Sequence, residues 1–288
     1  MISVVIAAYN EEKSIEKTVA EVRRVCTEMA VPFEIIAVDD GSTDATVSLL
    51  RELDVRVLSN PHNAGYGFSL KKGISAARYE TIVITDADQT YPFSQIPDLY
   101  RVFLKGFDMV VGARTGAPYT GSFFKMLLRK ILTFIVEFTA ERKIPDINSG
   151  LRIFKRDRAQ EFFSHLCNGF SFTTSLTLAY MMTGKFVSYV PIPYGQRAGK
   201  TKVRLLRDSL KTLQYILQAA IYYNPLKIFL LFSGLCLLFA GFWFCVSLVL
   251  GLTVGFFLGV GSILVALIVL CLGLLADLLR QILKGRSL

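Results

Sequence analysis

The sequence predicts an α/β domain built on a mostly parallel β-sheet, followed by a pair of membrane-spanning helices. Two observations carry this prediction. Short apolar runs alternate with amphipathic stretches through the first third of the chain, which is typical of a parallel sheet covered by helices on both faces. No Asp, Glu, Lys or Arg occurs between Lys227 and Asp277, although these types make up 19% of the chain. A wholly soluble enzyme and a polytopic transporter are therefore not the first expectations.

The expected strands are apolar runs of four to seven residues bounded by turn residues. They are Ile2–Ala7, Phe33–Val38, Val55–Ser59, Thr81–Thr85 and Asp108–Gly112. The expected amphipathic helices between them are Ser14–Met29, Asp44–Leu53 and Gly67–Ala77. The first strand follows Met1 without a basic leader or a small-residue cleavage site, so no signal peptide is expected.

The apolar tail divides near Gly251–Gly255 into two runs, each about 36 Å long as a helix and able to cross a hydrocarbon core of about 30 Å. Lys227 precedes the first run, basic residues follow the second, and the turn carries no charge. The positive-inside rule then predicts an integral membrane protein with the large domain and both termini in the cytoplasm. The alternative, one buried helical hairpin, is disfavoured by the length of the uncharged segment.

The expected organisation is a globular domain at 1–200, a juxtamembrane amphipathic helix at 201–226, two transmembrane helices at 227–279 and a basic tail at 280–288. Two basic amphipathic stretches, 122–140 and 201–223, are expected to lie in the lipid headgroup plane. Packing of their apolar faces on the domain is the alternative. Gly255 and Gly259 form a small-xxx-small pair able to pack helices within a protomer or between protomers, so a homo-oligomer is one expected assembly.

Charge, cysteine and histidine usage narrow the function classes. The net charge of +9 favours anionic lipid headgroups as the partner over nucleic acid, because a membrane segment is present. The five cysteines form no CxxC pair, so neither a zinc site nor a disulfide framework is expected, and a reducing compartment fits. With two His and no GxSxG motif, a His-centred catalytic triad is not expected.

Acidic side chains follow the expected strands at the sheet edge where α/β proteins bind their ligands. The six carboxylates that would gather there are Glu11, Glu12, Asp39, Asp40, Asp86 and Asp88. Asp86 and Asp88 directly follow an apolar strand and can present two carboxylates to one hard cation, which completes its coordination with substrate phosphates. A metal–diphosphate site with Mg²⁺ or Mn²⁺ is therefore expected, whereas Ser42 and Asp44 have a turn or helix cap as their simpler role.

A glycine-flanked basic segment, Gly195–Thr201, resembles a phosphate loop, but one residue too few separates its glycines. We interpret Arg197, Lys200 and Lys202 as a separate anion clamp. The alternative is a solvated basic linker that leads to the membrane.

Together these motifs resemble the family 2 glycosyltransferases, which have the GT-A (Rossmann-like) fold. The segments that carry the resemblance are Val4–Glu12, Val38–Asp44, Asp86–Asp88 and Asn148–Phe154. The segment Arg197–Lys202 and the apolar tail narrow it to polyprenyl-phosphate glycosyltransferases, such as those that use dolichyl or undecaprenyl phosphate. The resemblance runs from residue 2 to about 205.

The resemblance also implies residue roles. The implied catalytic residues are Asp86, Asp88, Arg114 and Arg152. Those implied for the donor nucleotide are Ala8, Tyr9, Asn10, Glu11, Asp39, Asp40 and Ala87. Those implied for the acceptor phosphate are Ser149, Arg197, Lys200 and Lys202, and those for the metal are Asp86, Asp88 and Gln89. Where relatives often carry a further Gln ligand, this chain has Thr90, and Gln89 lies one position earlier.

The expected function is transfer of a sugar from a GDP- or UDP-hexose to a membrane polyprenyl phosphate, with inversion at the anomeric carbon. Because a lipid phosphate has a second pKa of about 6, it is already nucleophilic at neutral pH and needs no side-chain base. A membrane-anchored family 2 transferase that glycosylates a hydroxyl is the alternative, and Asp146 would then be the base. A non-catalytic membrane assembly subunit is the alternative of another class. The sugar and the nucleotide stay open.

Overall fold

The computed structural model describes residues 1–115, 133–138, 140–193 and 205–285. Contacts group the chain into two compact units, Met1–Ile216 and Leu217–Leu288. The first unit holds all the strands described below, and the second holds two long apolar helices.

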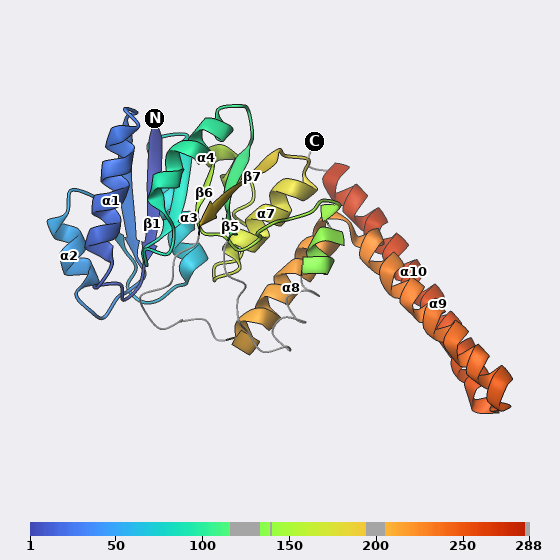
Figure 1. Cartoon of the computed structure of the whole chain (residues 1–288). Helices are drawn as coiled ribbons and strands as arrows, with labels where there is room; N and C mark the ends of the chain where they lie inside the picture. Colours follow the sequence, from blue (N-terminus) through green and yellow to red (C-terminus); the bar gives the residue numbers. More distant parts are fainter. Residues whose placement is uncertain (116–132, 139, 194–204, 286–288) are drawn as a thin grey trace. The chain divides into compact units, whose positions relative to one another are not determined.

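A seven-stranded sheet forms the centre of the first unit, in the order β3-β2-β1-β4-β6-β5-β7 (Figure 1). The strands are β1 Ile2–Ala8, β2 Phe33–Asp39, β3 Arg56–Ser59, β4 Thr81–Asp86, β5 Met109–Thr115, β6 Arg152–Lys155 and β7 Val187–Pro193. Only β6 runs antiparallel to its neighbours among these strands. The register aligns Ala8 with Asp39 and Ala7 with Asp86, so the acidic loops after β1, β2 and β4 leave the sheet side by side.

Helices cover both faces of this sheet, as the alternating pattern predicts. The main apolar core joins the sheet to α1 (Ile15–Glu28), α2 (Thr46–Glu52) and α4 (Ile96–Phe103), which follows the short 3₁₀ helix η1 (Phe93–Gln95). From the other face α3 (Tyr66–Ala76) packs on β1 and β2 and contacts α6 (Arg156–Gln160) and α7 (Phe172–Met182). This packing is close, because a Cβ on Gly73 of α3 would lie 2.4 Å from Val5 of β1.

All five predicted strands and all three predicted helices are present within two residues of their expected ends, except that β5 continues three residues past the predicted Gly112, to Thr115. Two further strands, β6 and β7, were not predicted. β6 is short and begins with a fully buried arginine, Arg152, so its sequence does not look like an apolar strand. β7 contains Pro191 and Pro193, and it tolerates them because it is the last of the described strands, and one side of its backbone has no ladder partner among them.

The second unit is dominated by two helices, α9 (Pro225–Leu250) and α10 (Thr253–Gly285), which run side by side (Figure 1). The Asn224 side chain accepts a hydrogen bond from the Lys227 backbone N–H and caps α9. Gly251 ends α9 in the left-handed region, with a φ of 64°. The break between the helices therefore falls where the sequence predicted it.

The contact between α9 and α10 depends on small residues of α10. A Cβ on Gly259 would lie 2.7 Å from the Phe244 ring, and one on Gly273 would lie 2.4 Å from the Phe229 Cβ. Ser233 Oγ donates a hydrogen bond of 3.0 Å to the Ala266 carbonyl across the same contact. The small-residue positions of α10 thus pack within the hairpin.

Both helices are long and apolar enough to cross a membrane, and only 17% of each apolar window is buried. The length and the exposure together indicate membrane anchoring rather than core helices. The last helix continues to Gly285, beyond the expected end of the second span at 279. Arg280 supports this extension by pairing with Asp277 and by donating to the Tyr223 carbonyl.

The expected amphipathic segments are described only in part. Residues 133–138 and 140 of the first are helical, and α8 (Leu205–Tyr223) accounts for most of the second. The boundary between the two compact units falls inside α8. The placement of either segment at a membrane surface, and the domain boundaries at 200, 226 and 279, stay predictions.

Candidate active site

A cleft of about 450 Å³ opens where β1, β2, β3 and β4 end. It is lined by residues that follow these strands, joined by residues that precede β6 and begin α7. The lining residues are Ala7, Ala8, Tyr9, Glu11, Asp40, Asn63, Gly65, Tyr66, Asp86, Ala87, Asp88, Asn148, Gly150, Gly169, Phe170 and Thr173. Most of the predicted donor-site residues are therefore brought together, because parallel strands deliver their following loops to one edge.

Asp86 is the last residue of β4 and is held on two sides. The Tyr66 hydroxyl donates a hydrogen bond of 2.7 Å to Asp86 Oδ1. On the other side the Asp86 carboxylate lies against Gly150, where a Cβ would come within 2.7 Å of Oδ1 and 2.8 Å of Oδ2. A glycine at position 150 therefore leaves the space that the carboxylate occupies.

Tyr66 itself is fixed by its surroundings. Its ring stacks on Phe170, with the ring centroids 6.1 Å apart and an angle of 13° between the planes. Burial, and next the negative charge of Asp86, raise the pKa of Tyr66 well above its ordinary value. The phenol is therefore protonated at neutral pH and acts as the hydrogen-bond donor to Asp86.

Asp88 is held from its own loop. Thr90 Oγ1 donates to Asp88 Oδ1 at 2.6 Å, and the Thr90 backbone N–H donates to the same atom at 3.2 Å. Between the two acids, the Ala87 carbonyl accepts a 2.9 Å hydrogen bond from Thr18 Oγ1 of α1. Gln89 adopts a left-handed backbone conformation (φ 60°) and is not among the residues that line the cleft.

The donor set at the cleft fits a divalent cation that arrives with a phosphorylated substrate. Among the described residues, no three His, Cys, Asp or Glu side chains are arranged to hold a metal ion by themselves. Asp86 and Asp88 line the same cleft, and two carboxylates completed by phosphate oxygens are the ligands that Mg²⁺ and Mn²⁺ prefer. The predicted ligands Asp86 and Asp88 are thus brought together, and the predicted third ligand, Gln89, is not placed with them.

The loop after β2 is organised by its two aspartates. Asp39 accepts hydrogen bonds from the Gly41 and Ser42 backbone N–H groups, both at 3.1 Å. Asp40 accepts three, from the Asn60 side chain and from two backbone N–H groups of the β3–α3 loop, each at 2.9 Å. Both carboxylates therefore shape the loops around the cleft, and only Asp40 lines it.

The loop after β1 is tied to the same region. Asn10 has a left-handed backbone (φ 52°), and its side-chain oxygen accepts a hydrogen bond of 2.8 Å from the Thr43 backbone N–H. Its own backbone N–H donates to Ser42 Oγ at 2.9 Å. Tyr9 and Glu11, on either side of Asn10, line the cleft.

Arg114, at the end of β5, makes a two-point ion pair with Asp146. Nε lies 2.6 Å from Asp146 Oδ2, and a terminal guanidinium nitrogen lies 2.8 Å from Oδ1. Burial alone would raise the pKa of Asp146, but the hydrogen bonds and charge of Arg114 outweigh it and hold the pKa below the usual value. Asp146 is therefore an ionised partner of Arg114 and a weak base.

Arg152 does not reach the cleft. Its side chain is fully buried and donates to the Ser149, Ile147 and Thr173 carbonyls at 2.7, 2.8 and 2.9 Å, and to a threonine hydroxyl of α7. The guanidinium thus ties the loop before β6 to α7, and Arg152 is not among the residues that line the cleft. Ser149 is also fully buried, and its hydroxyl has no hydrogen-bond partner among the described residues.

The basic segment expected to bind the acceptor, with Arg197, Lys200 and Lys202, lies outside the described residues. Tyr66, Asn63, Phe170 and Thr173 line the cleft although the sequence did not single them out. Asn63 and Tyr66 follow β3, so the strand-end rule finds them once it is applied to that strand. Phe170 and Thr173 lie beside the start of α7, whose approach to the sheet has no local sequence signal.

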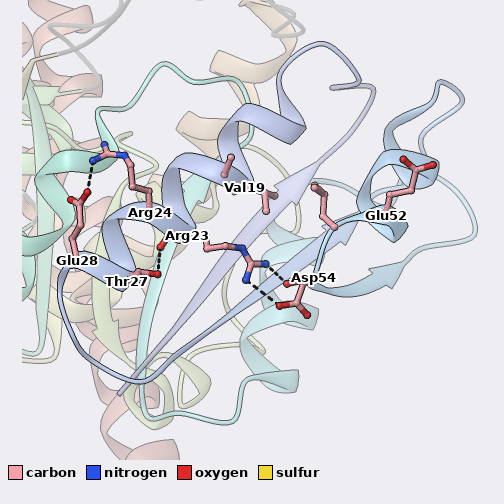
Figure 2. A pocket seen from close by; sticks show the side chains of 9 residues that line it. Val19, Arg23, Arg24, Thr27, Glu28, Glu52 and Asp54 are labelled. Carbon is pink, nitrogen blue, oxygen red and sulfur yellow. Dashed lines mark hydrogen bonds and ion pairs between the residues drawn. The ribbon is translucent and has the colours of Figure 1, made fainter.

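A second hollow, of about 530 Å³, lies on the surface between α1 and the residues around Asp54. Figure 2 shows its two arginines turned toward neighbouring acids: Arg23 pairs with Asp54, and Arg24 pairs with Glu28 at 2.7 Å. Both arginines that line the hollow are therefore paired with acids. The cleft at the strand ends is the candidate active site.

The fold and the cleft define an α/β enzyme that binds its ligand at the carboxyl edge of a mostly parallel sheet. The family profile of Glycosyl transferase family 2 matches residues 3–163. The chain belongs to this family, and the mostly parallel sheet is its GT-A fold, as the sequence predicted.

Relatives and solved structures agree with this assignment. The chain is 30% identical over 207 residues to a dolichyl-phosphate hexose transferase of Haloferax volcanii, which covers 70% of this chain and 86% of the relative. It is 26% identical over 234 residues to an undecaprenyl-phosphate 4-deoxy-4-formamido-L-arabinose transferase of Salmonella choleraesuis, with 79% of this chain and 69% of the relative covered. The chain is thus similar to enzymes that are named for sugar transfer and for a polyprenyl phosphate.

Among solved structures, glucosyl-3-phosphoglycerate synthase from Mycobacterium tuberculosis in complex with Mn²⁺, uridine diphosphate and glucosyl-3-phosphoglycerate has the same fold. Its TM-score is 0.61 at 21% identity, with 76% of this chain and 80% of that chain covered. The same enzyme with phosphoglyceric acid gives a TM-score of 0.63. At this level of identity the likeness concerns the fold alone.

Proposed function

We propose that this chain is an inverting glycosyltransferase that moves a sugar from a nucleoside diphosphate sugar to a membrane polyprenyl phosphate. The observation that carries the choice of acceptor is the two-point pair of Arg114 and Asp146. Asp146 is the candidate base for a hydroxyl acceptor, and its lowered pKa makes it a weak one. A phosphate acceptor needs no base, because it is largely a dianion at neutral pH.

The donor would lie in the cleft at the strand ends. We assign its nucleoside to the ends of β1, β2 and β4 and the loops that follow them, with Ala8, Tyr9, Asn10, Glu11, Asp39, Asp40 and Ala87. Its diphosphate would lie near Asp86 and Asp88, which would hold Mg²⁺ or Mn²⁺. When bound, the cation would act as a Lewis acid that stabilises the departing nucleoside diphosphate.

The chain's own residues then have three tasks. Asp86 and Asp88, held by their neighbours, fix where the diphosphate lies. Arg114, oriented by Asp146, supplies positive charge near the end of β5. Ser149, Arg197, Lys200 and Lys202 are assigned to the acceptor phosphate, which attacks the anomeric carbon in line with the leaving group and so inverts it.

The membrane would hold the acceptor beside the enzyme. The two apolar helices α9 and α10 support membrane anchoring, and a polyprenyl phosphate is confined to the same bilayer. We place the catalytic domain and both termini in the cytoplasm, because basic residues flank the apolar runs at these ends. Both relatives are named for a polyprenyl phosphate, dolichyl phosphate in one and undecaprenyl phosphate in the other, which agrees with this acceptor.

The test is sugar transfer by the purified full-length protein in lipid nanodiscs. UDP- and GDP-sugars are incubated one at a time with Mn²⁺ and undecaprenyl phosphate, and lipid products are identified by mass spectrometry. The expected result is a sugar phosphate lipid of inverted anomeric configuration by NMR, and no product with undecaprenol, which lacks the phosphate. Transfer to undecaprenol or to an added saccharide, with none to the phosphate, would contradict the proposal.

A further inference from the structure

We propose that Tyr66 and Thr90 are positioning residues: each supplies one hydroxyl donor to one carboxylate of the Asp86–Asp88 pair and thereby sets the geometry in which the pair binds a cation and diphosphate. The inference rests on the proposed function, since it concerns the same cleft. It extends that function to two hydroxyl residues for which the sequence predicted no contact.

The two contacts are alike in chemistry and come from different elements. Tyr66, at the start of α3, donates to Asp86 Oδ1 at 2.7 Å, and Thr90, after β4, donates to Asp88 Oδ1 at 2.6 Å. A hydroxyl that donates to a carboxylate makes a short, charge-assisted bond, and both distances are of this kind. Each carboxylate thus has one oxygen held by a hydroxyl, which restricts its side-chain torsions.

The donors are themselves fixed, which is what a positioning role requires. Thr90 is buried with 1% of its surface exposed. The Tyr66 ring stacks on Phe170. The start of α3 lies against the loop before α7, because the Phe68 backbone N–H donates to the Asn168 carbonyl at 2.9 Å. Because packing restricts the movement of both hydroxyls, they can restrain the carboxylates to which they donate.

The position of Thr90 adds a chemical reason. Carboxylates that ligate metals are in turn commonly hydrogen-bonded, and loss of such a partner costs about 10- to 100-fold in metal affinity. Thr90 donates to Asp88 through both its hydroxyl and its backbone N–H, so its described contribution is to orient a ligand.

The test measures binding of the cation, not turnover. Mn²⁺ is titrated into the full-length protein in detergent in the presence of UDP or GDP, with electron paramagnetic resonance reporting the free ion. Tyr66→Phe keeps the stacked ring, and Thr90→Val keeps the buried volume, so each removes mainly the donated hydrogen bond. We expect each variant to weaken Mn²⁺ binding about tenfold, with thermal stability in the absence of Mn²⁺ close to that of the wild type.

Thr85→Val is the matched control. Thr85 lies one residue before Asp86, is fully buried, and its hydroxyl has no hydrogen-bond partner within the described part of the chain. Removing that hydroxyl is expected to leave Mn²⁺ affinity unchanged. Wild-type affinity in both Tyr66→Phe and Thr90→Val, or an equal loss in Thr85→Val, would overturn the inference.

The outcomes separate this inference from the proposed function. If the wild type fails to bind Mn²⁺ in the presence of UDP and also in the presence of GDP, the metal–diphosphate site itself is contradicted, and the positioning role with it. If the wild type binds and both variants bind equally well, only the positioning role is contradicted. If the variants that bind Mn²⁺ more weakly also have a clearly lower melting temperature than the wild type without Mn²⁺, the hydroxyls are structural and the inference is again overturned.

Discussion

At the scale of single residues, Gly150 shows how a missing side chain shapes the cleft. Gly150→Ala would place a Cβ within 2.9 Å of three atoms of the Asp86 carboxyl group. Because that group is the end of a flexible side chain, we expect it to move while the fold persists. The expected result is a loss of transfer activity of about 100-fold, the effect of misplacing a reacting geometry by about 1 Å.

The measurement is the initial rate with a saturating donor, beside the melting temperature of the same preparation. Gly234→Ala is the control, because nothing lies within 4 Å of a Cβ at that position of α9. Wild-type activity in Gly150→Ala would show that Asp86 is not needed in its observed place.

The contribution of Asp146 to the stability of the fold is expected to depend on pH. Its folded-state pKa is lowered, so its pair with Arg114 stabilises the fold fully above the unfolded pKa of about 3.9. This contribution is lost as the pH falls through the folded pKa. Asp146→Asn is therefore expected to lower the free energy of unfolding by about 1.5–3 kcal/mol at pH 7, with the difference from wild type vanishing in strong acid.

Chemical denaturation at several pH values between 2 and 7 measures this difference. A difference that grows toward acid would contradict the direction of the pKa shift. The same variant also tests the acceptor: a carboxylate base contributes about 10²- to 10⁴-fold to the rate, so a smaller loss of activity supports a phosphate acceptor.

At the scale of elements, the contact of α9 with α10 depends on where glycine occurs. Gly273→Val would place a Cβ 2.4 Å from the Phe229 Cβ, and overpacking of this kind costs about 1–3 kcal/mol. Gly261→Val is the matched control on the same helix, because nothing lies within 4 Å of a Cβ there. Both changes have the same helix propensity, so only packing separates them.

Trp243 makes this measurable. It is the only tryptophan in the sequence and lies on α9, with its carbonyl near Gly255 of α10. Its fluorescence during heating in detergent therefore reports on the hairpin. We expect an earlier transition for Gly273→Val than for Gly261→Val, and equal transitions would contradict the packing described for the two helices.

At the scale of the whole molecule, the expected topology has a direct test. Both termini should be cytoplasmic, and the turn at Gly251 and Leu252 should be reachable only from the opposite side of the membrane. Leu252→Cys, in a variant without the five native cysteines, is treated in intact cells with a thiol reagent that does not cross the membrane. Labelling from outside is expected, and labelling only after the cells are opened would contradict two spans with cytoplasmic ends.

The local pattern of the sequence was sufficient for the framework of the molecule. Strand-length apolar runs, amphipathic connections and the charge-free tail are all local patterns of neighbouring residues. They were enough to predict the strands β1 to β5, the helices α1, α2 and α3, and the two long apolar helices. The gathering of Glu11, Asp40, Asp86 and Asp88 at one cleft was predictable too, because parallel strands end at one edge.

Only the tertiary structure decided what these side chains contact. Tyr66 and Asp86 are 20 residues apart in sequence, and Arg114 and Asp146 are 32 apart. The family resemblance implies a phosphate contact for Arg152, whereas the structure buries its side chain against α7, where it donates to Thr177, 25 residues away in sequence. Such pairs depend on the order of the strands in the sheet and on how one helix packs against it, and local sequence periodicity carries no information on either. The position of a residue at the end of a strand is a local property, and it was enough to locate the cleft.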